Sequence, residues 1–227
     1  MYRVSPSGIG MLLECPRCLW YHYNESYERP RGIFPSLPGG MDEVLKVYFD
    51  EHRAHGTLPP EIDGKIDGTL FTDRTKLDQW RNNRIGIKAE FPEYDMLLKG
   101  AIDDLLVDPA GKLIIFDFKT RGYPTKSDSS KYYVNQLNLY ALLFSLNGFE
   151  VADTGYLLFF WPDSYGLGQG QFATDLMSLP IDAAKGKETL RAAHGIITGS
   201  LPPAANDCVY CAYRTRGLAV ESKQTLL

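Results

Sequence analysis

Acidic residues and a lysine occur where a buried pair of strands should carry only apolar side chains. In LIIFDFKT, Asp117 and Lys119 follow a run of apolar residues, and Asp103 lies two residues before the apolar run LLV. Residues two apart on a strand share a face, so Asp117 and Lys119 point to the same side. Converging carboxylates repel each other unless a cation lies between them or one binds a proton. The pattern predicts a site for a hard divalent ion such as Mg²⁺ or Mn²⁺.

The turn sequence DPAG at 108–111 predicts that the two acidic segments form a hairpin. Counting back from this turn brings Asp103 roughly opposite Asp117. A metal held by both carboxylates and a backbone carbonyl, for which Phe118 is the candidate, lowers the pKa of a bound water and neutralises a phosphate oxygen. Lys119 would then stabilise the charge that develops on phosphorus. An exposed hairpin with solvated or salt-bridged side chains is the alternative for so short a motif.

The four cysteines form two C-x-x-C pairs near opposite ends of the chain. Cys15 and Cys18 lie in CPRC, and Cys208 and Cys211 lie in CVYC. Four thiolates complete a tetrahedral zinc site or hold one iron–sulfur cluster. The alternative is four thiols that bind nothing. A shared site would hold the two ends of the chain together and close a very long loop.

The composition is typical of a soluble globular protein. Hydrophobic residues make up 44% of the 227 residues and charged residues 23%, which argues against disorder. The net charge of -4 excludes an overall basic field, so nucleic-acid contacts require a local basic strip. The first residues lack the apolar segment of a signal peptide, and no run of 18 apolar residues occurs. We expect a cytoplasmic protein without membrane contact.

The spacing of apolar residues predicts an α/β core with helical additions. Ser5-Pro6 is a typical helix start, and the helix predicted there carries the first cysteine pair. A second helix is predicted at 41–56, where apolar residues recur at helical spacing before a glycine. Short apolar runs predict strands within 84–120. After these strands we expect a helix at 129–148, strands at 154–161 and 170–179, and a last helix at 181–199.

The motifs GAIDDLL, LIIFDFKT and QLNLY together resemble the PD-(D/E)XK nuclease superfamily, and within it the RecB-like exonucleases. These include the four-cysteine CRISPR-associated exonucleases and the AddB nuclease domain. The resemblance implies that Asp103 and Asp117 are metal ligands and that Lys119 is the catalytic lysine. It also implies that Gln136 and Tyr140 face the site, and their spacing of four residues does place them on one helix face.

The same resemblance implies a restriction-endonuclease-like core, in which helices flank a central mixed sheet. We expect a single domain over 1–227, with an N-terminal helical part at 1–80, the nuclease core at 81–178, and the C-terminal helix and cysteine pair at 179–227. By analogy the cysteines would hold a [4Fe-4S] cluster, with zinc as the alternative.

Two features depart from the family pattern. A metal-binding histidine is common upstream of the sheet in these exonucleases, and this chain has Asp42 at the corresponding place, which we expect to be a third ligand. Lys46 follows one turn later and could reach a substrate phosphate. The cysteines divide two and two, whereas the familiar cluster takes one from the N-terminal helix and three from the C-terminus.

These features predict a metal-dependent DNA nuclease, an exonuclease acting on single-stranded ends in repair, recombination or CRISPR adaptation, with other proteins of those systems as partners. The alternative is a catalytically weak or inactive nucleic-acid-binding or assembly subunit that retains the fold. A zinc-ribbon interaction protein would leave the strand carboxylates unexplained. Candidate phosphate contacts are Arg17, Arg29, Arg31, Arg81, Arg84, Arg121, Arg214 and Arg216. Candidate base-stacking residues are Trp20, Tyr21, Tyr132, Tyr133 and Tyr213.

Overall fold

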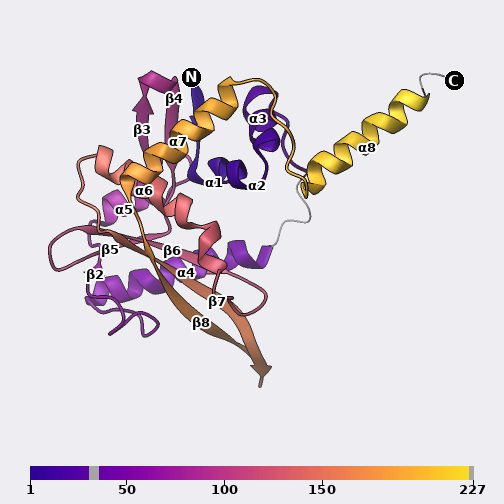
Figure 1. The fold of residues 1–227 in the computed structure, drawn as a ribbon. Coiled ribbons are helices and arrows are strands. Elements are labelled where there is room, and N and C mark those ends of the chain that lie inside the picture. Colours follow the sequence, from indigo (N-terminus) through magenta and orange to yellow (C-terminus); the bar gives the residue numbers. More distant parts are fainter. Residues whose placement is uncertain (31–35, 225–227) are drawn as a thin grey trace.

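A five-stranded mixed sheet forms the centre of the computed structural model, which describes residues 1–30 and 36–224 (Figure 1). Its strand order is β2-β5-β6-β7-β8, and only β6 and β7 are parallel. A parallel pair requires a crossover, which helix α6 (Val134–Leu146) supplies. The strands are β2 (Thr69–Leu70), β5 (Asp104–Val107), β6 (Leu113–Thr120), β7 (Thr154–Gly166) and β8 (Gln169–Pro180).

Helices cover both faces of this sheet, because β6 is apolar on both sides. Leu113 and Ile115 join the core cluster that contains residues of α6 and α7 (Ala183–Thr198). Phe116 and Phe118 point the other way and contact Phe49 of α4 (Ser36–His55), with ring centroids 5.5 and 4.7 Å apart. The predicted α/β core with a mixed sheet between helices is therefore confirmed.

A second, smaller sheet has the order β1-β4-β3. The chain start pairs in parallel with β4, and β3 pairs with the other edge of β4 in antiparallel fashion. The strand at the chain start was not predicted, because three residues carry no periodic signal of their own. The bounds are β1 (Tyr2–Val4), β3 (Ile87–Phe91) and β4 (Met96–Gly100), with the short 3₁₀ helix η1 (Pro92–Tyr94) between β3 and β4.

The N-terminal helix predicted from Ser5 onward is interrupted. The Ser5 hydroxyl does cap a helix start by accepting the N–H of Gly8 at 3.0 Å. The backbone of Cys15 is extended, however, because the ring of Pro16 disfavours helical geometry in the preceding residue. Three helices result: α1 (Pro6–Ile9), α2 (Met11–Glu14) and α3 (Pro16–Asn24). The break places Cys15 at the start of α3 and Cys18 in its first turn.

Helices α4, α6 and α7 lie where the apolar spacing predicted them, but a further helix at 209–224 follows the one that was expected to be the last. Helix α4 ends as expected before Gly56, whose φ of 66° lies in the left-handed region that favours glycine. Asp73 caps α5 (Arg74–Arg81), and the short 3₁₀ helix η2 (Ser129–Tyr132) precedes α6. Helix α8 (Val209–Gln224) projects away from the rest of the chain (Figure 1). Within the described ranges, no helix has both the length and the apolar character needed to cross a bilayer.

Candidate active site

Asp117 and Lys119 lie side by side at the C-terminal end of β6. Asp117 is buried, with 3% of its surface exposed, and its carboxylate forms an ion pair with the Lys119 ammonium. The same ammonium donates a hydrogen bond to Gln136 Oε1 at 3.2 Å and lies 4.8 Å from the ring centre of Tyr133. Burial alone would lower the pKa of Lys119, but the carboxylates of Asp117 and Asp103 outweigh it and raise that pKa. Lys119 is therefore held as a cation in a fixed position.

Asp103 reaches the same point from the neighbouring strand. It lies one residue before β5 rather than within it, so its predicted place on the strand was wrong by one residue. Because β5 pairs Asp104 with Phe116, Asp103 comes to lie opposite Asp117. Its Oδ2 accepts the backbone N–H of Phe118 at 3.0 Å. Burial, and after it the nearby Asp117 carboxylate, raise the pKa of Asp103 to about 8, because both oppose a second negative charge at this point.

The segment before Asp103 is built around Tyr140 of α6. The Tyr140 hydroxyl donates to the carbonyl of Ala101 at 2.6 Å, two residues before Asp103. A Cβ atom at Gly100 would lie 2.7 Å from the Tyr140 ring, so only glycine fits there. Ile102 anchors the segment in the core, where 1% of it is exposed. Gln136 and Tyr140 thus share a helix face as predicted, and they contact Lys119 and the Asp103 segment respectively.

Asp42 approaches this group from α4, with Lys46 between them. The Lys46 ammonium lies 2.6 Å from the Asp42 carboxylate and 3.7 Å from Asp103 Oδ1. Among the described residues, the group of three or more metal-capable side chains whose donor atoms lie within 4.8 Å consists of cysteines alone. Lys46 therefore links Asp42 to Asp103, and the carboxylate oxygens of Asp42, Asp103 and Asp117 are not gathered within that distance of one another.

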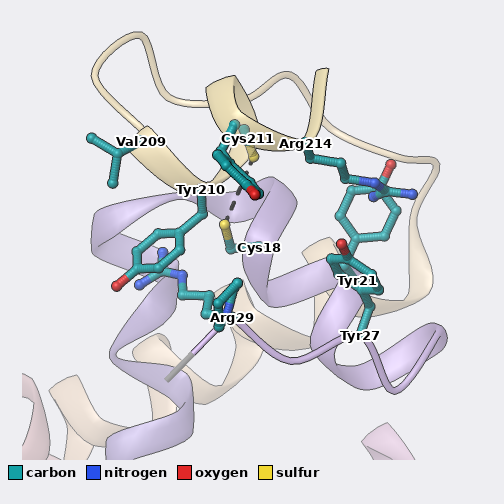
Figure 2. Close-up of a pocket in the computed structure, with 10 residues that line it drawn as sticks. Cys18, Tyr21, Tyr27, Arg29, Val209, Tyr210, Cys211 and Arg214 are labelled. Carbon is teal, nitrogen blue, oxygen red and sulfur yellow. Dashed lines mark hydrogen bonds between the residues drawn. The ribbon is translucent and has the colours of Figure 1, made fainter. Parts of the chain in front are cut away.

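The four cysteines are gathered. All four are buried, and their sulfur atoms lie within 4.8 Å of one another. Cys15 and Cys208 each precede a helix, and Cys18 and Cys211 lie in the first turns of α3 and α8 (Figure 2). Burial opposes ionisation of Cys15, but the backbone N–H groups of Ala205 and Cys18 outweigh it and lower its pKa to about 7. Burial raises the pKa of Cys18 and of Cys211. The site is suited to a metal by geometry, because four sulfur atoms this close together offer the ligand set of one ion, which would hold them as thiolates.

A model of the PD-(D/E)XK nuclease superfamily matches residues 35–216, which is most of the chain. The chain belongs to the PD-(D/E)XK nuclease superfamily. A solved structure described as "Crystal structure of SSO0001" is similar over 94% of this chain and 84% of that chain, with 19% sequence identity and a TM-score of 0.47. No curated protein matched the sequence.

Membership of the PD-(D/E)XK superfamily implies nuclease chemistry with a divalent metal and a nucleic-acid substrate. The two acids fit such an ion by their chemistry. Asp117 is buried and Asp103 half-buried, and both offer the carboxylate oxygens that Mg²⁺ and Mn²⁺ prefer.

A buried ion-pair network behind the acids was missed at the level of sequence. Asp104 is fully buried, and its two carboxylate oxygens contact Arg53 of α4 and Arg81 of α5, the latter at 2.8 Å. Arg81 also donates from Nε to the carbonyl of Asp103 at 2.7 Å and from Nη1 to Asp50 at 2.9 Å. The network therefore holds the backbone on which Asp103 is carried. No local signal marks Asp104, because its partners come from distant helices.

The predicted phosphate contacts lie in very different environments. The prediction that Arg81 contacts phosphate is wrong, because its guanidinium is buried and bound to Asp50, Asp104 and the Asp103 carbonyl. Arg17 is committed to the carbonyl of Pro202 at 2.8 Å, and Arg31 lies outside the described residues. Arg84 and Arg216 are exposed. Arg121 lines a cavity of about 290 Å³ next to the β6 end, with Tyr132 and Tyr133 among its other walls.

Replacing Arg81 with methionine should lower the free energy of unfolding by about 3 kcal/mol, because it leaves a buried carboxylate short of a partner. Urea titration followed by circular dichroism measures the change. Arg84→Met is the matched control, since Arg84 is exposed three residues away; we expect a change within about 0.5 kcal/mol there. Equal effects of the two substitutions would contradict a supporting role of the network.

Proposed function

We propose that this protein is a metal-dependent DNA nuclease of the RecB-like kind, an exonuclease that acts on single-stranded ends. The observation that carries the proposal is the convergence of Asp103, Asp117, Lys119 and Gln136 at one end of a strand pair. Superfamily membership supports the reaction class. The narrower resemblance to CRISPR-associated and AddB-type exonucleases supports a role in adaptation, repair or recombination, beside other proteins of those systems, with all of 1–227 as one domain.

In this proposal, Asp103, Asp117 and the Phe118 carbonyl hold Mg²⁺ or Mn²⁺, with Asp42 as a further ligand. When bound, the metal supplies a water of lowered pKa and neutralises a phosphate oxygen. Lys119 is already held as a cation by Asp117 and by Gln136, so it can stabilise charge on the scissile phosphate without rearranging. Tyr140 is a positioning residue, because its hydroxyl holds the Ala101 carbonyl and thereby the segment that carries Asp103.

The cavity beside Lys119 supports a single-stranded substrate. Its walls include Arg121 and the rings of Tyr123, Tyr132 and Tyr133. The Arg121 guanidinium lies 4.8 Å from the Tyr123 ring centre and donates to Ser129 Oγ at 2.6 Å, so its position is fixed. A cation beside exposed aromatic rings suits the phosphate and unpaired base of a single strand.

Removing the Asp117 carboxylate or the Lys119 ammonium should reduce DNA cleavage by about 10²-fold or more, because each lies at the proposed reacting phosphate. The assay uses end-labelled linear single strands, linear duplexes and circular single strands, with Mg²⁺ or Mn²⁺. Asp117→Ala and Lys119→Ala are compared with the wild type, and Asp163→Ala, an exposed acid on β7, is the control.

An exonuclease should degrade the linear strands and spare the circles. Cleavage that persists in both Asp117→Ala and Lys119→Ala would remove the proposed site. A wild-type protein that binds DNA but does not cleave it would favour the alternative function, that of a non-catalytic subunit. The ion pairs of Lys46 with Asp42 and Asp103 support this alternative, because they place an ammonium group where a metal ion would bind.

The third ligand is tested by binding alone. Asp42→Ala should weaken Mn²⁺ binding about tenfold, since it removes one anionic oxygen donor, an effect of roughly 1.4 kcal/mol. Isothermal titration calorimetry without DNA measures it. Glu43→Ala alters the next acidic residue on α4, which is exposed, and should leave the affinity unchanged. If the two variants bind Mn²⁺ equally well, Asp42 is no ligand.

For the cysteine site, the sulfur spacing supports zinc over the [4Fe-4S] cluster expected by analogy. Three of the sulfur pairs are 3.5, 3.8 and 3.8 Å apart, and all four sulfur atoms lie within 4.8 Å of one another. Ligands at a Zn–S distance of about 2.3 Å around one tetrahedral ion are about 3.8 Å apart. The cysteines of a [4Fe-4S] cluster bind four different irons and therefore have to be spread more widely.

Protein purified without air should therefore contain one zinc per chain and no absorption band near about 400 nm. Elemental analysis and the visible spectrum together check this. Stoichiometric iron with that band would contradict the zinc assignment and restore the cluster. Removal of either metal should lower the thermal midpoint, because the site joins α3 to the start of α8.

A further inference from the structure

A pocket lies beside the cysteines, away from the candidate active site. Its volume is about 450 Å³, within the range of roughly 300–1,000 Å³ that is usual for small-ligand sites. Segments near both ends of the chain form its walls (Figure 2). None of its lining residues also lines the cavity next to Lys119. Neither the proposed nuclease reaction nor metal binding by the cysteines assigns a role to this pocket.

Four tyrosines line the pocket, and three of them are exposed. Tyr27, Tyr210 and Tyr213 show 50%, 39% and 77% of their surface, and Val209 beside them shows 70%. When large apolar side chains are clustered on an exposed surface, that surface is often a binding site. The lining contains no acidic residue.

Two arginines complete the pocket, and one of them has no acidic partner among the residues that the structure describes. The guanidinium of Arg214 lies 3.8 Å from the ring centre of Tyr21 and 4.8 Å from that of Tyr27, which fixes its position. Within the described ranges Arg214 forms no ion pair, and its Nη1 is buried with no hydrogen-bond partner. Arg29, by contrast, pairs with Glu14 while it covers the Tyr210 ring at 4.7 Å.

We propose that this pocket binds one nucleotide of single-stranded DNA, with the phosphate on Arg214 and the base against Tyr213. A fixed guanidinium accepts an anion, and an exposed tyrosine ring offers a face on which a base can stack. Only an unpaired strand offers free base faces, so duplex DNA is excluded from the pocket. The inference rests on the proposed function for its choice of DNA, and it adds a holding site apart from the point of cleavage.

Binding is measured in the full, metal-loaded chain carrying Asp117→Asn, so that the strand is held and not cut. Fluorescence anisotropy follows a labelled oligothymidylate of about 16 nucleotides, the upper end of the site sizes of single-strand binding modules. Tyr213→Ala should weaken binding roughly 5- to 150-fold, which corresponds to the loss of one stacked base. Arg214→Gln should reduce the slope of log affinity against log salt by about 0.7, the value for one lost phosphate contact.

Matched controls come from the same chain. Tyr165→Ala removes a tyrosine with 80% exposure on the β7–β8 hairpin, and Arg191→Gln removes an exposed arginine of α7. Both should bind as the parent does. Arg214→Lys keeps the charge and should restore the salt slope. Thermal midpoints of all variants show whether each is folded.

A second readout locates the base directly. Light-induced cross-linking of an oligonucleotide that carries 5-iodouridine should attach it to Tyr213 or Tyr210. Binding that Tyr213→Ala and Arg214→Gln leave unchanged, or cross-links confined to other surfaces, would overturn the proposal, and so would a parent chain with no affinity for the strand. A protein partner in the pocket would produce the first of these outcomes. The nuclease proposal fails separately, through the cleavage assay of the unsubstituted chain.

Discussion

The hydrogen bond from the Phe118 N–H to the Asp103 carboxylate is the contact on which the site depends. The last residue pair of the β5–β6 ladder is Asp104 with Phe116. The hydrogen bond lies just beyond this pair and holds Asp103 opposite Asp117. Burial and the repulsion between the two carboxylates together raise the pKa of Asp103. The fold must hold them together against that repulsion until a cation binds.

Buried contacts on three sides provide that restraint. Tyr140 fixes the chain two residues before Asp103, the room for its ring exists because residue 100 is glycine, and Arg81 binds the carbonyl of Asp103 itself. Asp104 in turn holds Arg81 and Arg53. The adjacent acids Asp103 and Asp104 therefore have opposite tasks: Asp103 faces the candidate metal position, and Asp104 is neutralised inside the protein.

Much of this arrangement could be predicted from sequence where the signal was local. The alternation of β6, the hairpin register and the shared face of Gln136 and Tyr140 follow from residue spacing, and the meeting of the cysteines follows from their number and pairing. The burial of Arg81 could not be predicted, because Asp104 lies 23 residues away and Arg53 lies 51 residues from that acid. Nor could the parallel pairing of β1 with β4. The break at Cys15 did have a local signal, since a proline follows it.

We propose above all that Asp103 and Asp117 bind a single divalent ion where β5 begins and β6 ends. Crystals of the protein soaked in Mn²⁺ test this most directly, through the anomalous scattering of the metal. We expect one strong peak between the two carboxylates, with the Lys119 ammonium alongside. A map with no peak there, or with peaks only at exposed acids such as Asp163, would contradict it.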